Sequence, residues 1–229
     1  MKQKLIFVLL LIFGFSITEA QKTYVPDDGF EQYLIDEGYD DVLDDSVTTE
    51  NINTITVVSI PTPIEEDSIY SVNDLTGIQD FTAVTRLYVT DNNLTSLDVS
   101  GLLHLYKIYC MNNAITNLNV SNNPALTELL CSNNQLTSLD VSNNTSLTQL
   151  HCNNNQLSGT MPESICNLSI DFSDSAVFNI SNNQFCSPYP SCVEEYIGYQ
   201  DTTNCNQVSI YDETIPITYY LYNAYPNPF

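Results

Sequence analysis

The chain of 229 residues is long enough for one domain of moderate size or for an elongated repeat array, and too short for several large domains. It carries 28 acidic residues against 5 lysines and arginines, which argues against binding to nucleic acid or to an anionic membrane surface. A hydrophobic fraction of 43% is that of a chain with a buried core and argues against disorder.

The first twenty residues have the features of a secretory signal peptide. Lys2 and Lys4 precede an unbroken apolar run from Leu5 to Phe15, and Thr18-Glu19-Ala20 supplies small residues for a cleavage site. Because a membrane-spanning helix needs about 20 apolar residues, we prefer cleavage after Ala20 to a membrane anchor. The mature chain then has 3 cations and 27 anions, a net charge of −24. We expect a protein without a membrane span that is secreted or attached to the outer cell surface.

Residues 21–51 predict an N-terminal cap with a short amphipathic helix. Asp27 or Asp28 is placed to cap the start of that helix. The residues expected on its apolar face are Phe30, Leu34 and, as a third candidate, Ile35.

An acidic cluster follows the helix at Asp40, Asp41, Asp44 and Asp45. One interpretation is a calcium site, but the cluster lacks the regular spacing of an EF-hand loop, so we prefer a solvated acidic surface. Residues 61–73, with two prolines and three acidic residues, indicate a loop inserted before the regular repeats.

A period of 21 residues runs through the middle of the chain, and each turn reads L-x-x-L-x-(V/C)-x-x-N-x-L. Apolar residues two apart predict short strands with one buried face, at 86–90, 107–111, 128–132 and 149–153. A unit this small cannot bury its own apolar face, so we expect stacked turns that form a parallel solenoid over residues 52–192. The inward column of the strands is Leu87, Ile108, Leu129 and Leu150.

The pattern resembles the leucine-rich repeat, in the 21-residue form common in secreted bacterial proteins. The resemblance is specific over residues 84–157 and weaker over 55–83 and 158–192, where residues 155–162 are similar to an L-x-G-x-(I/M)-P variant. It implies an α/β repeat fold: a curved leucine-rich-repeat solenoid with parallel strands on one face, a short helical cap at the N-terminus and a cysteine-containing cap at the C-terminus.

Asparagine is frequent, with 26 residues, and one asparagine recurs at a fixed place in each turn. An asparagine side chain at a tight turn can bond backbone groups that would otherwise lack a partner. We therefore expect a structural ladder rather than a ligand site, formed by Asn92, Asn113, Asn134 and Asn155.

The seven cysteines fall into two groups. Cys110, Cys131 and Cys152 occupy an inward strand position one turn apart, where we expect buried thiols rather than a disulfide or a metal site. The others follow the repeats, in or before a C-terminal cap and linker expected at 193–215, and an exported protein can oxidise them. Four cysteines allow three pairings, and we expect at least one bridge in the 186–205 segment. These disulfide candidates are Cys166, Cys186, Cys192 and Cys205.

The last residues, 216–229, resemble the start of the C-terminal sorting domain used by type IX secretion. Tyr225-Pro226-Asn227-Pro228-Phe229 carries this resemblance. A full sorting domain is much longer, so the resemblance implies that the sequence is a truncated piece of a larger protein.

No catalytic motif is present in the sequence, and we expect no enzyme activity, no cofactor and no metal. The two histidines, His104 and His151, are far apart in the sequence. His151 cannot act on Cys152, because neighbouring strand residues point to opposite faces.

The outward strand positions are the candidate binding surface. Two of the three mature cations stack there in one column, beside a Tyr-Tyr-Leu-His column, and together they could hold an acidic group of a partner. The alternative is an aromatic ladder that only stabilises the sheet. The candidate ligand-binding residues are Arg86, Tyr88, Lys107, Tyr109, Met111, Glu128, Leu130, Gln149 and His151.

These features predict an exported, monomeric recognition or adhesion module that binds a protein, or with less support a glycan, through its strand-lined face. The alternative is a structural spacer or accessory repeat region of a larger type IX secreted protein whose activity lies in missing sequence.

Overall fold

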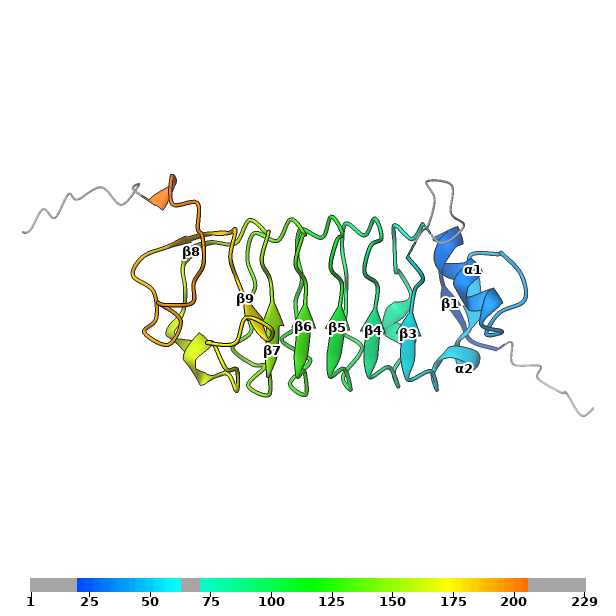
Figure 1. The fold of residues 1–229 in the computed structure, drawn as a ribbon. Coiled ribbons are helices and arrows are strands. Elements are labelled where there is room, and N and C mark those ends of the chain that lie inside the picture. Colours follow the sequence, from blue (N-terminus) through cyan, green and yellow to red (C-terminus); the bar gives the residue numbers. More distant parts are fainter. Residues whose placement is uncertain (1–19, 63–70, 206–229) are drawn as a thin grey trace, which may run out of the picture.

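Six short parallel strands lie side by side along the molecule and form one continuous sheet (Figure 1). The structure is a computed structural model that describes residues 20–62 and 71–205. Each strand joins the sheet next to the strand of the preceding turn, so the chain winds as a parallel solenoid. In spatial order the strands are β3 (Val57–Ser59), β4 (Arg86–Tyr88), β5 (Lys107–Tyr109), β6 (Glu128–Leu130), β7 (Gln149–His151) and β9 (Phe178–Asn179).

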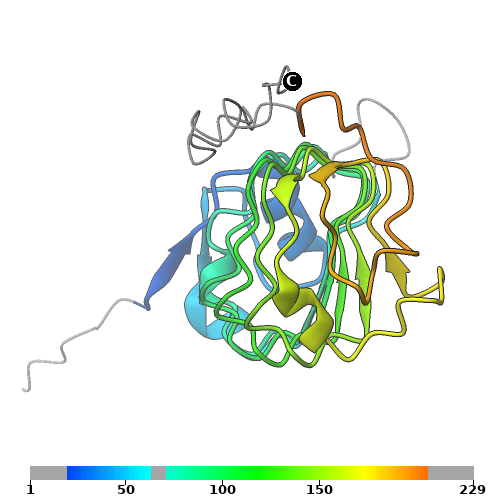
Figure 2. The ribbon, with the colours of Figure 1, turned by 90° about the vertical axis from the view of Figure 1, so that its left-hand side faces the viewer.

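The central residue of each strand points into the core and is in register with the next strand. Leu87 lies opposite Ile108, Ile108 opposite Leu129, and Leu129 opposite Leu150. All four side chains are at most 2% exposed. The predicted inward column is therefore confirmed, and Figure 2, a view along the solenoid, shows the successive turns overlaid.

The strands end two residues earlier than the sequence pattern predicts. β4 stops at Tyr88, although the hydrogen bonds between turns continue, with Val89 N donating to Tyr109 O at 2.8 Å. The chain is then close to a corner, where Asp91 takes a left-handed φ of 56°. Asparagine and aspartate tolerate this conformation better than other non-glycine residues. The same corner recurs at φ 55°, 56° and 55° in Asn112, Asn133 and Asn154.

Asn113, Asn134 and Asn155 form the predicted structural ladder. Asn134 is representative: its Nδ2 donates to Cys110 O at 2.9 Å and to Cys131 O at 3.1 Å, and its Oδ1 accepts the N–H of Ile115 at 3.0 Å. Asn113 and Asn155 make the equivalent bonds one turn away. Each of these amides thus satisfies backbone groups of two successive turns.

The N-terminal cap contains β1 (Lys22–Tyr24), α1 (Asp28–Asp36), β2 (Ser46–Thr48) and α2 (Thr49–Ile52), at the blue end of Figure 1. Asp27 caps α1 as predicted, accepting the N–H of Phe30 at 2.9 Å. Phe30 and Leu34 are fully buried, and Ile35 is half-buried. The sequence did not predict the antiparallel pairing of β1 with β2. A short 3-10 helix, η1 (Ile78–Asp80), precedes the regular turns.

The C-terminal cap is held by two disulfides, Cys166–Cys192 and Cys186–Cys205. The second confirms the bridge expected in the 186–205 segment. In this cap β10 (Gln184–Cys186) pairs in parallel with β8 (Ser158–Thr160), and η2 (Glu163–Asn167) carries Cys166. The disulfides thus join segments of this irregular cap to one another.

Cys110, Cys131 and Cys152 are free and buried, as predicted. Burial raises the pKa of the Cys110 and Cys152 thiols to about 12, and it raises the pKa of Cys131 as well. All three are therefore neutral at physiological pH and act as small apolar side chains.

Some predictions from sequence fall wholly or partly outside the described residues. They are the signal peptide, the start of the sorting domain, most of the loop predicted at 61–73, and residues 206–215 of the predicted C-terminal cap and linker.

Candidate binding face

The outward side chains of β4 to β7, which we call the strand face, occupy a regular grid. Each of these strands buries its middle residue and turns its first and third residues outward, and register aligns them in columns. The strand face consists of Arg86, Tyr88, Lys107, Tyr109, Glu128, Leu130, Gln149 and His151, with the half-buried Met111 just beyond β5.

The first column is not the pair of free cations that the sequence suggests. Lys107 Nζ forms an ion pair with Glu128 Oε1 at 2.6 Å. Gln149 Nε2 donates to Ala176 O at 3.1 Å. Lys107 and Glu128 neutralise each other, so Arg86 is the remaining cation of the column without a carboxylate partner among the described residues.

The second column begins with a packed aromatic pair. The rings of Tyr88 and Tyr109 meet edge to face, with centroids 5.0 Å apart. The hydroxyl of Tyr109 donates a hydrogen bond to Glu128 Oε2. Burial, together with this bond to a carboxylate, raises the pKa of Tyr109 to about 12. Both rings are half-buried, so each has a fixed position and still offers surface to a partner.

The second column continues with Leu130 and His151, which offer less surface than expected. Leu130 is only 8% exposed, because its neighbours in register are the larger side chains Tyr109 and His151. His151 is half-buried, and its Nε2 is shielded from solvent without a hydrogen-bond partner among the described residues. Burial lowers the pKa of His151, which favours the neutral ring at pH 7.

A second amide ladder lies at the corner beside the strand face, which sequence analysis missed. Asn112 Nδ2 donates to Asp91 Oδ1 at 2.6 Å, and Asn133 Nδ2 donates to Asn112 Oδ1 at 2.7 Å. Asn154 and Asn182 extend the chain, each bond again 2.7 Å long. The 21-residue spacing of Asp91, Asn112, Asn133 and Asn154 was the signal that could have revealed it.

The predicted acidic cluster does not come together as a calcium site. The carboxylates that approach one another, within 4.8 Å, belong to Asp28, Glu31 and Asp45. Glu31 is buried and already accepts the backbone N–H groups of Asp44, Asp45 and Ser46. This carboxylate therefore anchors the loop that leads into β2.

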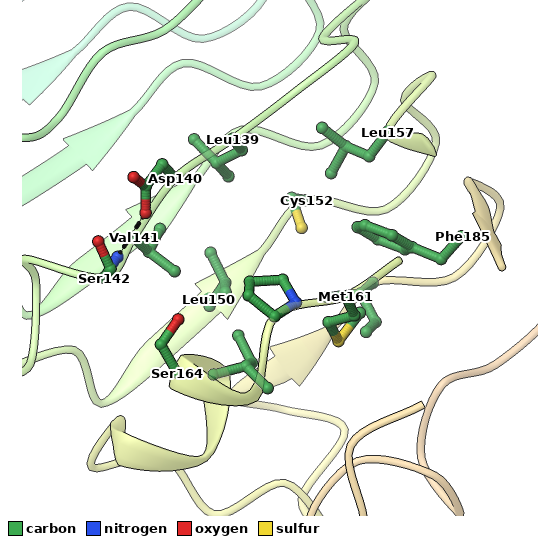
Figure 3. Close-up of a pocket in the computed structure, with 13 residues that line it drawn as sticks. Leu139, Asp140, Val141, Ser142, Leu150, Cys152, Leu157, Met161, Ser164 and Phe185 are labelled. Carbon is green, nitrogen blue, oxygen red and sulfur yellow. Dashed lines mark hydrogen bonds between the residues drawn. The ribbon is translucent and has the colours of Figure 1, made fainter. Parts of the chain in front are cut away.

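A small apolar cavity lies inside the solenoid at its C-terminal end (Figure 3). Leu150, Leu157, Met161 and Phe185 line it, and the thiol of Cys152 points into it. Its volume is about 50 Å³, compared with roughly 150 Å³ for a cavity that binds benzene. With a neutral thiol and so little room, the cavity is a packing gap between the regular turns and the cap.

Comparison with known proteins identifies the repeats. A family model described as leucine-rich repeats in two copies matches residues 124–165. The functional domain of InlJ from Listeria monocytogenes, which includes a cysteine ladder, is 25% identical over 82% of this chain and 44% of that chain, with a TM-score of 0.51. The fold is a leucine-rich-repeat solenoid.

Two other leucine-rich-repeat structures are less similar. The internalin inlF from Listeria monocytogenes is 20% identical over 64% of this chain and 46% of that chain, with a TM-score of 0.49. A leucine-rich-repeat protein from Leptospira interrogans is 24% identical over 57% and 33%, with a TM-score of 0.46. The chain therefore spans less than half the length of these relatives. No curated protein matches the sequence significantly.

Proposed function

We propose that the protein is a recognition module that binds another protein through the strand face. The observation that carries the proposal is the fixed aromatic pair, Tyr88 and Tyr109, on the rigid sheet. Aromatic side chains with few rotatable bonds give large contact areas and lose little freedom on binding. The ion pair of Lys107 with Glu128 borders the rings and supplies a polar rim.

The distribution of charge supports the same surface. Residues 84–157 contain four acidic residues and two cations, whereas residues 21–51 contain ten acidic residues and one cation. Most of the acidic residues therefore belong to segments outside the turns that carry the strand face. This distribution favours a partner surface that need not be strongly basic.

We also propose that the protein is exported and acts in recognition or adhesion at the cell surface. The two disulfides support an oxidising compartment. Among residues 20–62 and 71–205, no helix has both the length and the apolar character needed to cross a bilayer. The apolar run before Ala20 and the type IX resemblance of residues 216–229 motivate the proposed route.

The first step of the test is to identify the partner by crosslinking from the strand face. A photo-crosslinking amino acid placed at Met111, beside the strand face, should capture a protein from the source organism's surface fraction. The matched position is Asn117, which is exposed on a loop outside the strand face. A partner captured equally from both positions would contradict the proposal.

The captured partner is then measured against an aromatic double variant. Tyr88→Ala with Tyr109→Ala should weaken binding by roughly 2 kcal/mol, about 30-fold. The matched control is Tyr196→Ala with Tyr199→Ala, since these rings are 42% and 70% exposed in the C-terminal cap. Unchanged affinity of the strand-face variant would remove the site, and a large fall in its melting temperature alone would assign the rings a structural role.

A further inference from the structure

Arg86 is the single arginine of the sequence, and its guanidinium is incompletely satisfied. The Nε atom is shielded from solvent and has no hydrogen-bond partner among the described residues. Its neighbours in register are Val57 on β3 and Lys107 on β5, so neither adjacent strand offers it a carboxylate. A shielded donor without an acceptor is unfavourable, and in native proteins it asks for an explanation.

The contrast with Lys107 makes the unpaired state of Arg86 unusual. The mature sequence has 27 acidic residues and three cations. Lys107, one strand away, has a carboxylate oxygen at 2.6 Å. With acidic groups so abundant, a local carboxylate partner for Arg86 would be easy to supply, yet no described acidic residue lies within ion-pair distance of it.

We propose that Arg86 is the point at which the strand face recognises an Asp or Glu side chain of its protein partner. This inference rests on the proposed function and narrows the chemistry of the ligand. The carboxylate would accept hydrogen bonds from the guanidinium, including Nε after the covering side chains shift aside, in the side-on geometry that arginine favours. Lys107 does not bind this carboxylate, because it is already paired with Glu128.

The surroundings favour a protein carboxylate over a phosphate or an acidic sugar. Tyr88 follows Arg86 by two residues on the same face of β4 and packs on Tyr109, so an apolar surface lies beside the cation. A partner segment with an acidic side chain next to an aliphatic or aromatic one would match both the cation and the apolar surface. A phosphate carries more negative charge and would be repelled more strongly by a protein with this net charge.

The single arginine permits a direct measurement. In the 15N-labelled protein the arginine Nε–H region of an NMR spectrum holds one resonance, from Arg86. The probe is the capped tripeptide acetyl-Leu-Glu-Leu-amide, and its matched control is acetyl-Leu-Gln-Leu-amide. We expect the Glu peptide to shift the resonance saturably with a Kd in the millimolar range, and the Gln peptide to leave it in place. Equal shifts with both peptides, or none with either, would overturn the proposal.

Two further ligands distinguish a protein carboxylate from other anions that the site could bind. Glucuronate or inorganic phosphate that shifts the resonance when the Glu peptide does not would replace the proposal with an acidic-glycan or general anion site. Arg86→Gln should remove the effect of the Glu peptide on the backbone amide of Tyr88, while Lys22→Gln should preserve it, since Lys22 is an exposed cation on β1, outside the strand face. Loss of that effect in both variants would show that it depends on net charge and would contradict the proposal.

Binding of the captured partner distinguishes this inference from the proposed function. Arg86→Gln should weaken binding at least about tenfold, and the control Lys22→Gln, outside the strand face, less than about threefold. If binding depends on Tyr88 and Tyr109 but not on Arg86, the carboxylate proposal fails and the proposed function stands. If binding depends on none of them, the strand face itself is excluded.

Discussion

At the scale of single residues, Glu128 organises the middle of the strand face. Its carboxylate accepts from Lys107 Nζ at 2.6 Å and from the hydroxyl of Tyr109. Burial by itself would raise the pKa of Glu128, but the hydrogen bonds from Lys107 and Tyr109 outweigh it and lower that pKa. The same contact with Glu128 raises the pKa of Lys107. At neutral pH Lys107 is therefore positively charged, Glu128 negatively charged and Tyr109 neutral.

Glu128→Gln should lower the free energy of unfolding by about 0.5–1 kcal/mol at pH 7, the usual range for partly exposed ion pairs. Because the folded pKa of Glu128 is lowered, its contribution is present above the unfolded value of about 4.3 and is lost as the pH falls through the folded value. Urea unfolding of the wild type and of Glu128→Gln, at pH 7 and near pH 3, measures this difference in the free energy of unfolding.

The matched control is Glu163→Gln, an exposed residue with the same change of charge. Its difference from the wild type should be small at both pH values. A difference for Glu128→Gln that stays constant with pH would show that the ionised carboxylate contributes nothing.

The buried cysteines give a second prediction at this scale. Because burial raises the pKa of Cys110 and Cys152 to about 12, a thiol reagent should react with the native protein very slowly. After denaturation without reductant, three thiols should react, since the other four cysteines are in disulfides. Fewer than three would show that the column is oxidised.

At the scale of elements, each turn is joined to the next by two parallel amide ladders with different surroundings. The inner ladder, represented by Asn134, bonds backbone groups in the core. The outer ladder, represented by Asn133, bonds only the exposed amides of Asn112 and Asn154. Adjacent residues of the same type therefore have unequal importance for stability.

Asn134→Ala should cost roughly 2 kcal/mol of unfolding free energy, because it leaves the buried N–H of Ile115 without a partner. It also removes one bond each to Cys110 O and Cys131 O, which keep their bonds from Asn113 and Asn155. Asn133→Gly should cost less than about 1 kcal/mol, since its lost bonds are exposed and glycine accepts the left-handed φ of 56°. Chemical denaturation measures both. Equal losses would contradict the division between inner and outer ladders.

Sequence reasoning succeeded in the core, where the 21-residue period controls the environment of each buried residue. It predicted the inward column that begins at Leu87, the inner asparagine ladder and the buried thiols. The reason is that similar turns place equivalent residues in equivalent positions. It was less successful on the strand face. The period places Lys107 and Glu128 on adjacent strands, but it does not say that they pair with each other, and the burial of Leu130 depends on the size of its neighbours.

The caps were harder to predict for a related reason. They do not repeat, so no column constrains them. The pairing of Cys166 with Cys192 was one of several open to four cysteines. The pairing of β1 with β2 joins segments more than twenty residues apart, without a turn signal between them. In both cases the contact depends on the folded path of an irregular segment.

At the scale of the whole molecule, stability is unevenly distributed along the axis. The middle turns have a neighbour on each side, whereas the C-terminal cap depends on Cys166–Cys192 and Cys186–Cys205, with sequence separations of 26 and 19 residues. Closing loops of this length stabilises a fold by roughly 3 kcal/mol each in the chain-entropy description. Solenoids with weak ends open from those ends.

Cys186→Ser with Cys205→Ser should therefore loosen the C-terminal end first. Hydrogen exchange should speed up at β10 and its partner β8, while β4 to β6 keep their protection. Cys166→Ser with Cys192→Ser should extend the effect to η2, which carries Cys166. A uniform loss of protection over all strands would show instead that the solenoid unfolds as a single unit.

The uniform register between turns has a consequence for how such a gene changes in length. The strands β4, β5, β6 and β7 pair in the same register at each step. The two sides of every turn are therefore complementary to the sides of any other regular turn. Unequal recombination that adds or removes one 21-residue unit would leave both junctions chemically intact. Each such event would nevertheless rearrange the strand face. For example, loss of the turn that holds Glu128 would place Lys107 beside Gln149. The number of repeats can thus vary with little effect on folding, while each change alters which side chains lie next to one another on the strand face.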